Sequence, residues 1–454
     1  MRSVAALALL GTAALYLATA GLPFFSESYS HLAAAHARTF ADCFDPERIP
    51  LRPGQHVWFW VFARTGATPP VARLPGFLAH AASCVLVFRL ARLLGCRPGP
   101  AAAAAAVFLA YPNVQSLVWV AAVGWPWRVL FSLAALCALL SPRGPARGAL
   151  WLGGFLLALA CNQGGVVLPG VGAVLVVARD GTKAWRGLAR DPWFAASVVL
   201  AGAYVLYLGW LRPPAVHAPV QGAALANNLA RAAVALAPAD LRVPVLDLLR
   251  GERPWPGIAA LAALGAGAVA WWWRAPWAVR GLLLAIPLEL APAVAVTGFV
   301  PRYAYLASAF FAVALVLAWQ GTAARRARVP VATAIALLAA AWVRDTVADV
   351  GEYRRAGAAV RAVVAQARAL AAGASDDATF VMVDAPTLEG AERDVPVFDW
   401  ALPEALAWHG VPGRWQAVAT AAPRWLRGVE HVAPGALEER LRGVRWVRYR
   451  APAD

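Results

Sequence analysis

The sequence predicts an all-α polytopic membrane protein that ends in a small α/β domain. Of its 454 residues, 61% are hydrophobic, and the mean hydropathy is +0.58. Soluble domains are nearer half apolar, and many runs in this chain approach the roughly 20 apolar residues that cross a bilayer. After about residue 343 these runs stop, and polar and apolar residues mix. The composition therefore predicts a bundle of membrane helices followed by a separate domain.

About eleven apolar runs, bounded by breaks at Pro, Gly and Arg, are long enough to be considered as crossings. They span residues 4–22, 74–94, 101–120, 127–141, 149–161, 165–178, 194–211, 256–273, 277–297, 303–320 and 329–343. The first run resembles a signal peptide, but it is longer than a usual hydrophobic region and is followed by a weak cleavage signal. We therefore expect an uncleaved first helix. The fifth and sixth runs are short and predict a kinked hairpin around CNQGG (161–165).

The distribution of charge predicts the orientation of these helices. The formal charge is +16, with 41 basic and 25 acidic residues. In a soluble protein that balance would favour nucleic-acid binding. Here the arginines lie in short loops between apolar runs, as the positive-inside rule expects of cytoplasmic loops. With a cytoplasmic N terminus, every cytoplasmic loop is basic, and these loops hold only two acids, Asp180 and Asp191. We therefore expect a membrane lipid environment and no nucleic-acid partner.

This orientation leaves three sizeable parts outside the cytoplasm. The loop 24–73 follows the first helix, and the loop 212–255 contains a segment typical of a helix lying along the interface, 222–238. The third part is the tail, which begins with a helical pattern. Probable strands follow at ATFVMVDAP (378–386), RWQAVAT (414–420) and VRWVRYR (444–450).

We predict a transmembrane domain over 1–343 and an extracytoplasmic α/β domain over 344–454. One lysine, Lys183, beside forty arginines is typical of a GC-rich bacterial genome. The expected location is therefore the plasma membrane of a bacterium.

An acid and a histidine follow the first helix, in PFFSESYSHL (23–32). If this stretch is a helix capped by Ser26, Glu27 and His31 share one face. Loop acids at a membrane surface are usually solvated, which is the simpler interpretation. However, the Pro-Phe-Phe segment at 23–25 would anchor the helix start and fix where Glu27 points. A partly desolvated carboxylate there could act as a general base toward a hydroxyl.

Two arginines lie in aromatic segments at the expected outer surface. Arg52 is in PLRPGQHVWFW (50–60), and Arg302 is in VPRYAYLASAFF (300–311), at the entry to the tenth helix. A guanidinium grips phosphate in bidentate fashion, and a helix N-terminus adds positive potential near Arg302. The alternatives are an Arg52 bound to lipid headgroups and an Arg302 in a simple aromatic belt with Tyr303 and Tyr305.

Signatures of several other classes are missing from the sequence. There is no Walker loop, GxSxG, HExxH or suitably placed GxGxxG motif, and the five cysteines form no CxxC pair. The apolar runs hold hardly any carboxylate except Glu289. A proton-driven transporter would be expected to carry more.

The order of these stretches resembles that of a known family. An acidic segment after the first helix is followed by Arg-Pro and an aromatic helix, then by LPGFLAHAASCVLVFRLARLL (74–94), YPNVQSLVWVAA (111–122) and VPRYAYLASAFF. This pattern resembles the GT-C glycosyltransferases that use polyprenyl-phosphate sugars, a class that includes protein O-mannosyltransferases and their bacterial relatives. The similarity covers roughly residues 1–343.

The resemblance implies transfer of a sugar from a lipid-phosphate carrier to an acceptor hydroxyl, on a glycan or a protein, outside the cytoplasm. By position, Glu27 would be the base or would help to hold a divalent ion, and Arg52 and Arg302 would bind the carrier phosphate. His31, Tyr303 and Tyr305 are expected beside them. The resemblance implies no certain cofactor besides the donor, and it leaves a divalent metal open.

The chain departs from the family pattern at two places. The family commonly has two adjacent acids after the first helix, whereas Glu27 is followed by Ser28. Asp42 or Asp45, in the same loop, could supply a second acid. Residues 162–163 are Asn-Gln where many relatives carry a charge.

Three hypotheses follow from the sequence. The first is a membrane glycosyltransferase. The second is a catalytically silent protein of the same fold that binds a polyprenyl lipid or scaffolds envelope-glycan assembly, as the broken acidic pair suggests. The third is a transporter of a lipid-linked sugar, which would be expected to show two related halves and polar residues along the helices. The sequence shows neither feature.

Overall fold

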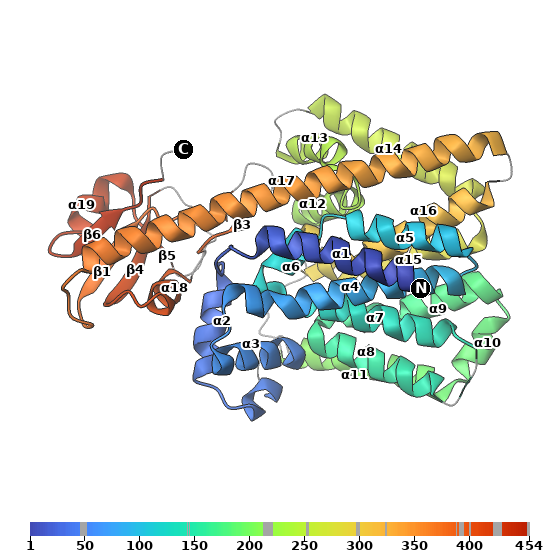
Figure 1. Ribbon diagram of the computed structural model, residues 1–454, viewed down its shortest axis with the longest axis horizontal. Coiled ribbons are helices and arrows are strands. Elements are labelled where there is room, and N and C mark those ends of the chain that lie inside the picture. The colour runs from blue at the N-terminus through green and yellow to red at the C-terminus, as the bar shows by residue number, and fades with distance from the viewer. Residues whose placement is uncertain are drawn as a thin grey trace.

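The structure, a computed structural model, consists of a helical bundle and a small α/β domain joined by one long helix (Figure 1). It describes residues 1–45, 52–142, 144, 146–211, 221–250, 254–296, 300–322, 325–386, 388–389, 395–398, 401–420 and 429–451. Parts of the predicted loops 24–73 and 212–255 therefore fall outside the described residues.

Nine helices within the described residues are long and apolar enough to cross a membrane, consistent with a multi-pass membrane protein. They are α1 (Arg2–Thr19), α4 (Pro69–Leu93), α7 (Gly124–Leu140), α9 (Leu168–Asp180), α11 (Pro192–Leu211), α14 (Pro254–Arg274), α15 (Trp277–Val296), α16 (Tyr305–Gly321) and α17 (Arg325–Ala371), of which α7, α9 and α16 reach this length together with the 3-10 helices before them. Two shorter apolar helices are α5 (Pro98–Ala110) and α8 (Arg147–Cys161). Each of the predicted runs overlaps one of these helices.

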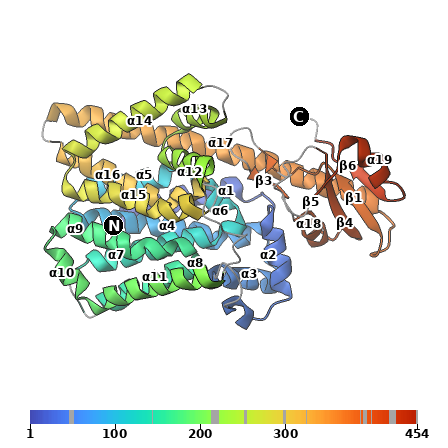
Figure 2. The same cartoon turned by 180° about the vertical axis from the view of Figure 1, so that it is seen from behind.

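The bundle has two distinct ends. The N terminus and α10 (Ala184–Ala189) lie at the end away from the α/β domain, here called the far end (Figures 1 and 2). At the near end, beside the domain, lie α2 (Glu27–His36) and α3 (Pro53–Thr65), with the 3-10 helix η1 (Ala41–Phe44) next to α3. Two further helices, α12 (Gly222–Ala233) and α13 (Ala239–Arg250), come from the predicted loop 212–255.

The third predicted run, 101–120, is only partly a long helix. The helix α5 ends at Ala110, because the residue before Pro112 is disfavoured in the α conformation. The chain continues as α6 (Val114–Val118) and the 3-10 helix η2 (Val120–Ala122), which contact α4, α2 and α7 near the candidate site. The sequence did not predict this break.

The hairpin predicted around CNQGG is present. Helix α8 ends at Cys161, and Asn162 begins the 3-10 helix η3 (Gln163–Val167) by accepting a hydrogen bond from the Gly164 N–H at 2.9 Å. Neither glycine leaves room for a side chain: a Cβ on Gly164 would lie 2.9 Å from the Arg128 guanidinium, and one on Gly165 would lie 2.8 Å from the Leu159 nitrogen. Close packing therefore explains both glycines.

Helix α17 has 47 residues, about 70 Å at the usual rise per residue. The sequence pattern suggested a membrane run at 329–343 and a separate helix in the tail, but the two are continuous. The predicted domain boundary at 343 lies inside this helix. The α/β domain is therefore built on the end of a helix that also packs against α5 and α6.

The α/β domain contains a parallel four-stranded sheet in the order β5-β4-β1-β6. The strands are β1 (Thr379–Val383), β4 (Arg414–Ala419), β5 (Val429–His431) and β6 (Arg445–Arg448), so all three predicted strands are found. A two-stranded ribbon, β2 (Leu388–Glu389) and β3 (Val395–Pro396), and the short helices α18 (Leu402–Trp408), η5 (Pro434–Ala436) and α19 (Leu437–Arg440) complete it. Helix α18 packs on α2 of the bundle.

A buried arginine fixes the chain where it leaves α1. Arg73, near the start of α4, is 2% exposed. Its Nε donates to the Val118 carbonyl at 2.8 Å, and Nη1 donates to the carbonyls of Thr19 at 3.2 Å and Leu22 at 2.8 Å. Its Nη2 donates to the Pro23 carbonyl. Buried carbonyls need donors, and this one side chain supplies four of its five N–H groups.

Replacing Arg73 with methionine should lower the free energy of unfolding by about 2–4 kcal/mol, because four buried carbonyl oxygens lose their donor. Thermal unfolding of the purified protein in detergent measures the loss. Arg92→Met is the matched control, since the exposed Arg92 in the same helix makes one local bond to the Cys96 carbonyl. Equal losses in the two variants would contradict the role given to Arg73.

Candidate functional site

The backbone before Glu27 is strained. Ser26 has φ 45° and ψ −128°, a region unusual for a residue with a side chain, and such strain costs of order 1–3 kcal/mol. Its N–H donates to the Val397 carbonyl of the α/β domain at 2.7 Å. Ser26 stands at the predicted cap position, but its hydroxyl has no hydrogen-bond partner within the described residues. The turn is therefore held by tertiary contacts and not by the predicted side-chain cap.

Two phenylalanines just before this turn pack against other parts of the protein. Phe24 meets Trp408 of α18 at a ring distance of 5.5 Å, and Phe25 meets Tyr353 of α17 at 5.4 Å. Both phenylalanines are buried. The sequence predicted that these residues anchor the helix at the membrane interface; in the structure they pack against the α/β domain and α17. As a result, the start of α2, with Glu27, has a defined place.

The structure brings Glu27, Arg52 and Arg302 together from three separate segments. Burial raises the pKa of the Glu27 carboxyl, and the charges of Arg302 and Arg52 partly offset this. Burial lowers the pKa of Arg52, with the nearby Tyr303 and Glu27 among the groups that oppose it. No hydrogen bond or ion pair joins Glu27 to either arginine among the described residues. The three charges are therefore near enough to interact electrostatically, but they make no direct contact.

Each arginine is positioned without an acid. The Arg302 guanidinium lies 4.7 Å from the Trp119 ring centre and 5.3 Å from that of Tyr303. Arg52 precedes Pro53, the first residue of α3, and its Nε is buried with no hydrogen-bond partner in the described part of the chain. Within the described residues this group consists of two cations and one carboxylate, so it carries an excess of one positive charge when Glu27 is ionised. An anion with one negative charge would neutralise it.

The other predicted residues differ in how close they lie to these three charges. Tyr303 contacts the Trp125 ring at 5.1 Å and belongs to the group around Arg52 and Arg302. Tyr305 does not: its hydroxyl lies 2.6 Å from His80 Nδ1, and its ring stacks on Phe108 inside the bundle.

His31 packs on Phe59 with a ring distance of 4.7 Å. Burial, with the charges of His56, Arg52 and Arg38, lowers its pKa to about 4. His31 is therefore neutral near pH 7, and it can serve there as a hydrogen-bonding group but not as a cation.

The residues considered as a second acid have other partners. Asp42 Oδ2 accepts a hydrogen bond from the Thr39 N–H at 2.7 Å, and Asp45 interacts electrostatically with Tyr207. Ser28, which stands where the family has an acid, is buried, and its Oγ accepts a hydrogen bond from the Ala121 N–H at 3.1 Å. Among the described residues, no group of three or more His, Cys, Asp or Glu side chains is placed to hold a metal ion.

A polar cavity that the sequence did not predict adjoins this group. It has a volume of about 50 Å³, room for a few waters. Its wall includes Arg52, Tyr303, Asn162, Gln163, Arg128 and Glu289. Arg128 and Glu289 form an ion pair in which both side chains are at most 2% exposed. Within the described residues, Arg128 Nε, Glu289 Oε2 and Gln163 Oε1 have no hydrogen-bond partner.

The signal for this pair was present in the sequence but incomplete. Glu289 stood out as a carboxylate in an apolar run, but its partner lies 161 residues away. Burying an unpaired charge is costly, so a lone intramembrane acid implies a partner without naming it. Only the tertiary structure, in which Arg128 of α7 bonds the Gly164 carbonyl of η3 and pairs with Glu289 of α15, identifies that partner.

No protein-family model matches the sequence, and a search of curated proteins finds no match. A function for this chain therefore has to be inferred from its own geometry.

Glu27→Gln should stabilise the protein more at pH 7 than at pH 4. The folded-state pKa of Glu27 is raised, so the stability linked to its protonated form is complete below the ordinary value of 4.5 and is lost as the pH rises through the folded-state value. A neutral glutamine avoids that loss. Melting temperatures of both proteins at the two pH values test this, with Glu438→Gln, on exposed α19, as the control. If Glu27→Gln stabilises the protein no more at pH 7 than at pH 4, the burial of an ionised Glu27 is contradicted.

Glu289→Met should cost about 3–5 kcal/mol, because it leaves Arg128 buried and unpaired. The double variant Arg128→Met/Glu289→Met should cost less than Glu289→Met alone, since no charge is then stranded. Unfolding of the purified proteins measures both. The single variant Arg128→Met completes the comparison. If the loss of unfolding free energy in the double variant equals the sum of the losses in the two single variants, the charges are not coupled.

Proposed function

We propose that the protein is an integral membrane glycosyltransferase that moves a sugar from a polyprenyl-phosphate carrier to an acceptor hydroxyl. The observation that carries the proposal is the convergence of Glu27, Arg52 and Arg302, which interact electrostatically but form no ion pair with one another among the described residues. A polyprenyl-phosphate sugar is a phosphodiester with one negative charge. That charge matches the excess of one positive charge at the site.

The same charges suit the reaction. The acceptor oxygen forms a bond to the anomeric carbon while its proton passes to the Glu27 carboxylate. The bond between the anomeric carbon and the phosphate oxygen breaks, and its electron pair leaves with the polyprenyl phosphate. Negative charge therefore grows on the phosphate in the transition state, and Arg52 and Arg302 stabilise it. A base with a raised pKa accepts the proton more readily, and Glu27 has this property.

The arrangement of the bundle supports where this chemistry would occur. The site lies at the near end, at the level where α1 ends and α16 begins. The far end carries the basic loops, which the positive-inside rule assigns to the cytoplasm. On this proposal the near end and the α/β domain face the outside of a bacterial plasma membrane, where an acceptor glycan or protein would be met.

One observation favours a second candidate function, a silent protein that binds the lipid carrier. Ser28 replaces the second acid of the related pattern, and its hydroxyl is committed to the Ala121 N–H. A metal held by two adjacent carboxylates is therefore not available at this turn. A single general base needs no metal, so the two candidates differ in whether Glu27 is required.

The test is a deletion strain complemented with wild type, Glu27→Gln, Arg302→Gln or the control Glu438→Gln, each at equal expression. Membrane lipids and envelope glycans are then analysed by mass spectrometry. We expect a polyprenyl-phosphate sugar or an unmodified acceptor to accumulate in the deletion strain. Wild type and the control should clear it, whereas Glu27→Gln should slow clearance roughly 10²–10⁴-fold.

The outcomes separate the candidates. Full clearance by Glu27→Gln together with loss of clearance by Arg302→Gln would favour the silent lipid-binding protein. No change in any polyprenyl-linked sugar or acceptor on deletion would overturn both.

A further inference from the structure

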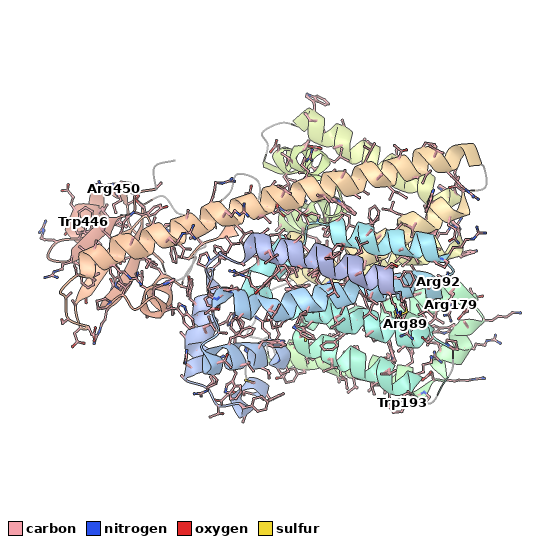
Figure 3. All side chains as sticks on the ribbon, in the orientation of Figure 1. Arg89, Arg92, Arg179, Trp193, Trp446 and Arg450 are labelled. Carbon is pink, nitrogen blue, oxygen red and sulfur yellow. The ribbon has the colours of Figure 1, made fainter. Side chains whose placement is uncertain are left out.

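A second polar cavity lies at the far end of the bundle, opposite the candidate site. It has a volume of about 610 Å³ and is bounded by the ends of α7, α8 and α9, by α10 and by the start of α11. Arg89, Arg92, Arg179 and Trp193 gather at this end, whereas Trp446 and Arg450 belong to the α/β domain (Figure 3). The charged residues on its wall are Arg147, Arg179, Lys183, Arg190, Asp180 and Asp191.

The acids on this wall already have partners. Asp180 pairs with Arg179 through both carboxylate oxygens, at 2.7 and 2.6 Å. Asp191 accepts hydrogen bonds from the Trp193 and Phe194 N–H groups at the start of α11, and it lies 3.7 Å from Arg147.

The other two cations on the wall are not neutralised. Among the described residues, the side chains of Lys183 and Arg190 make no hydrogen bond or ion pair, and both are exposed. The cavity therefore carries an excess of positive charge with free donors.

An aromatic and apolar surface adjoins these charges. Trp193 is on the cavity wall and is 45% exposed. A Cβ on Gly148 would lie 2.1 Å from the Trp193 ring, so the glycine lets the indole seat against α8. Further along the same two helices, Leu150 is 62% exposed and Val199 is 69% exposed. A charged cavity thus opens next to apolar helix faces at the end of the membrane-length helices.

We propose that this cavity binds the phosphodiester headgroup of an anionic phospholipid, with Lys183 and Arg190 as its main contacts. Trp193 lies at the boundary between headgroup and acyl chains, where amphipathic rings are favoured. The acyl chains lie along the exposed faces of α8 and α11. Basic pockets between membrane helices bind anionic headgroups in this way, and the inference does not depend on the proposed enzyme activity.

The test is native mass spectrometry of the full-length protein in a mild detergent, titrated with phosphatidylglycerol, cardiolipin or phosphatidylcholine. We expect the wild type to retain the two anionic lipids in preference to phosphatidylcholine. Lys183→Gln/Arg190→Gln should weaken that binding roughly 30-fold, because each basic residue near a membrane surface contributes about fivefold. The matched control is Arg186→Gln/Arg274→Gln, which removes two exposed cations that do not line the cavity.

Two results would overturn the proposal. Equal weakening by the control pair would show a general effect of charge and not a site. Displacement of the bound lipid by millimolar inorganic phosphate, with no preference among the three lipids, would show a site for a free anion. The melting temperatures of both double variants are measured as well. Values equal to that of the wild type ensure that misfolding explains neither result.

Discussion

The four hydrogen bonds of Arg73 are the constraint on which the candidate site depends. One buried guanidinium ties the end of α1, the segment that leads to Glu27 and the end of α6 to the start of α4. Three of the bonded carbonyls belong to the stretch that leaves α1, so loss of Arg73 would leave the carbonyls of Thr19, Leu22 and Pro23 without this buried donor. Burying an arginine is costly unless its donors are used, and here most of them are. The acid is therefore placed by a charge that takes no part in the proposed chemistry.

The second influence on Glu27 comes from the α/β domain. The strained Ser26 is held by Val397, and the ring of Phe24 is held by Trp408, while the Tyr29 hydroxyl lies 3.2 Å from His409 Nε2. Strain of this kind persists only where the surroundings over-determine it. The domain thus helps to set the position of the catalytic candidate, although it contributes none of the three charges. The long helix α17 therefore contributes to the site, because it connects the bundle to the domain that packs on α2.

Much of the fold could be predicted because it depends on local pattern. Apolar runs predicted the position of each long helix, although only part of α17, and alternation predicted β1, β4 and β6. The boundaries of the third run missed the break after Ala110, because the apolar residues of α6 and η2 outweighed the turn signal of Pro112 and Asn113. Glu27, Arg52 and Arg302 were each predicted from one segment, and the structure adds that they lie near enough to interact electrostatically. Arg73 and the pair of Arg128 with Glu289 could not be predicted, since their partners lie 36 to 161 residues away and are partly backbone carbonyls.

The most direct test of the central claim is whether the group of Glu27, Arg52 and Arg302 binds a lipid-borne phosphate. Purified protein would be titrated with a polyprenyl phosphate and with the matching polyprenol, which lacks the phosphate, and binding would be followed by native mass spectrometry. The account predicts that wild type prefers the phosphate and that Arg52→Gln/Arg302→Gln abolishes the preference while binding the polyprenol as before. Equal binding of both lipids by wild type, or a preference that survives the double substitution, would contradict it.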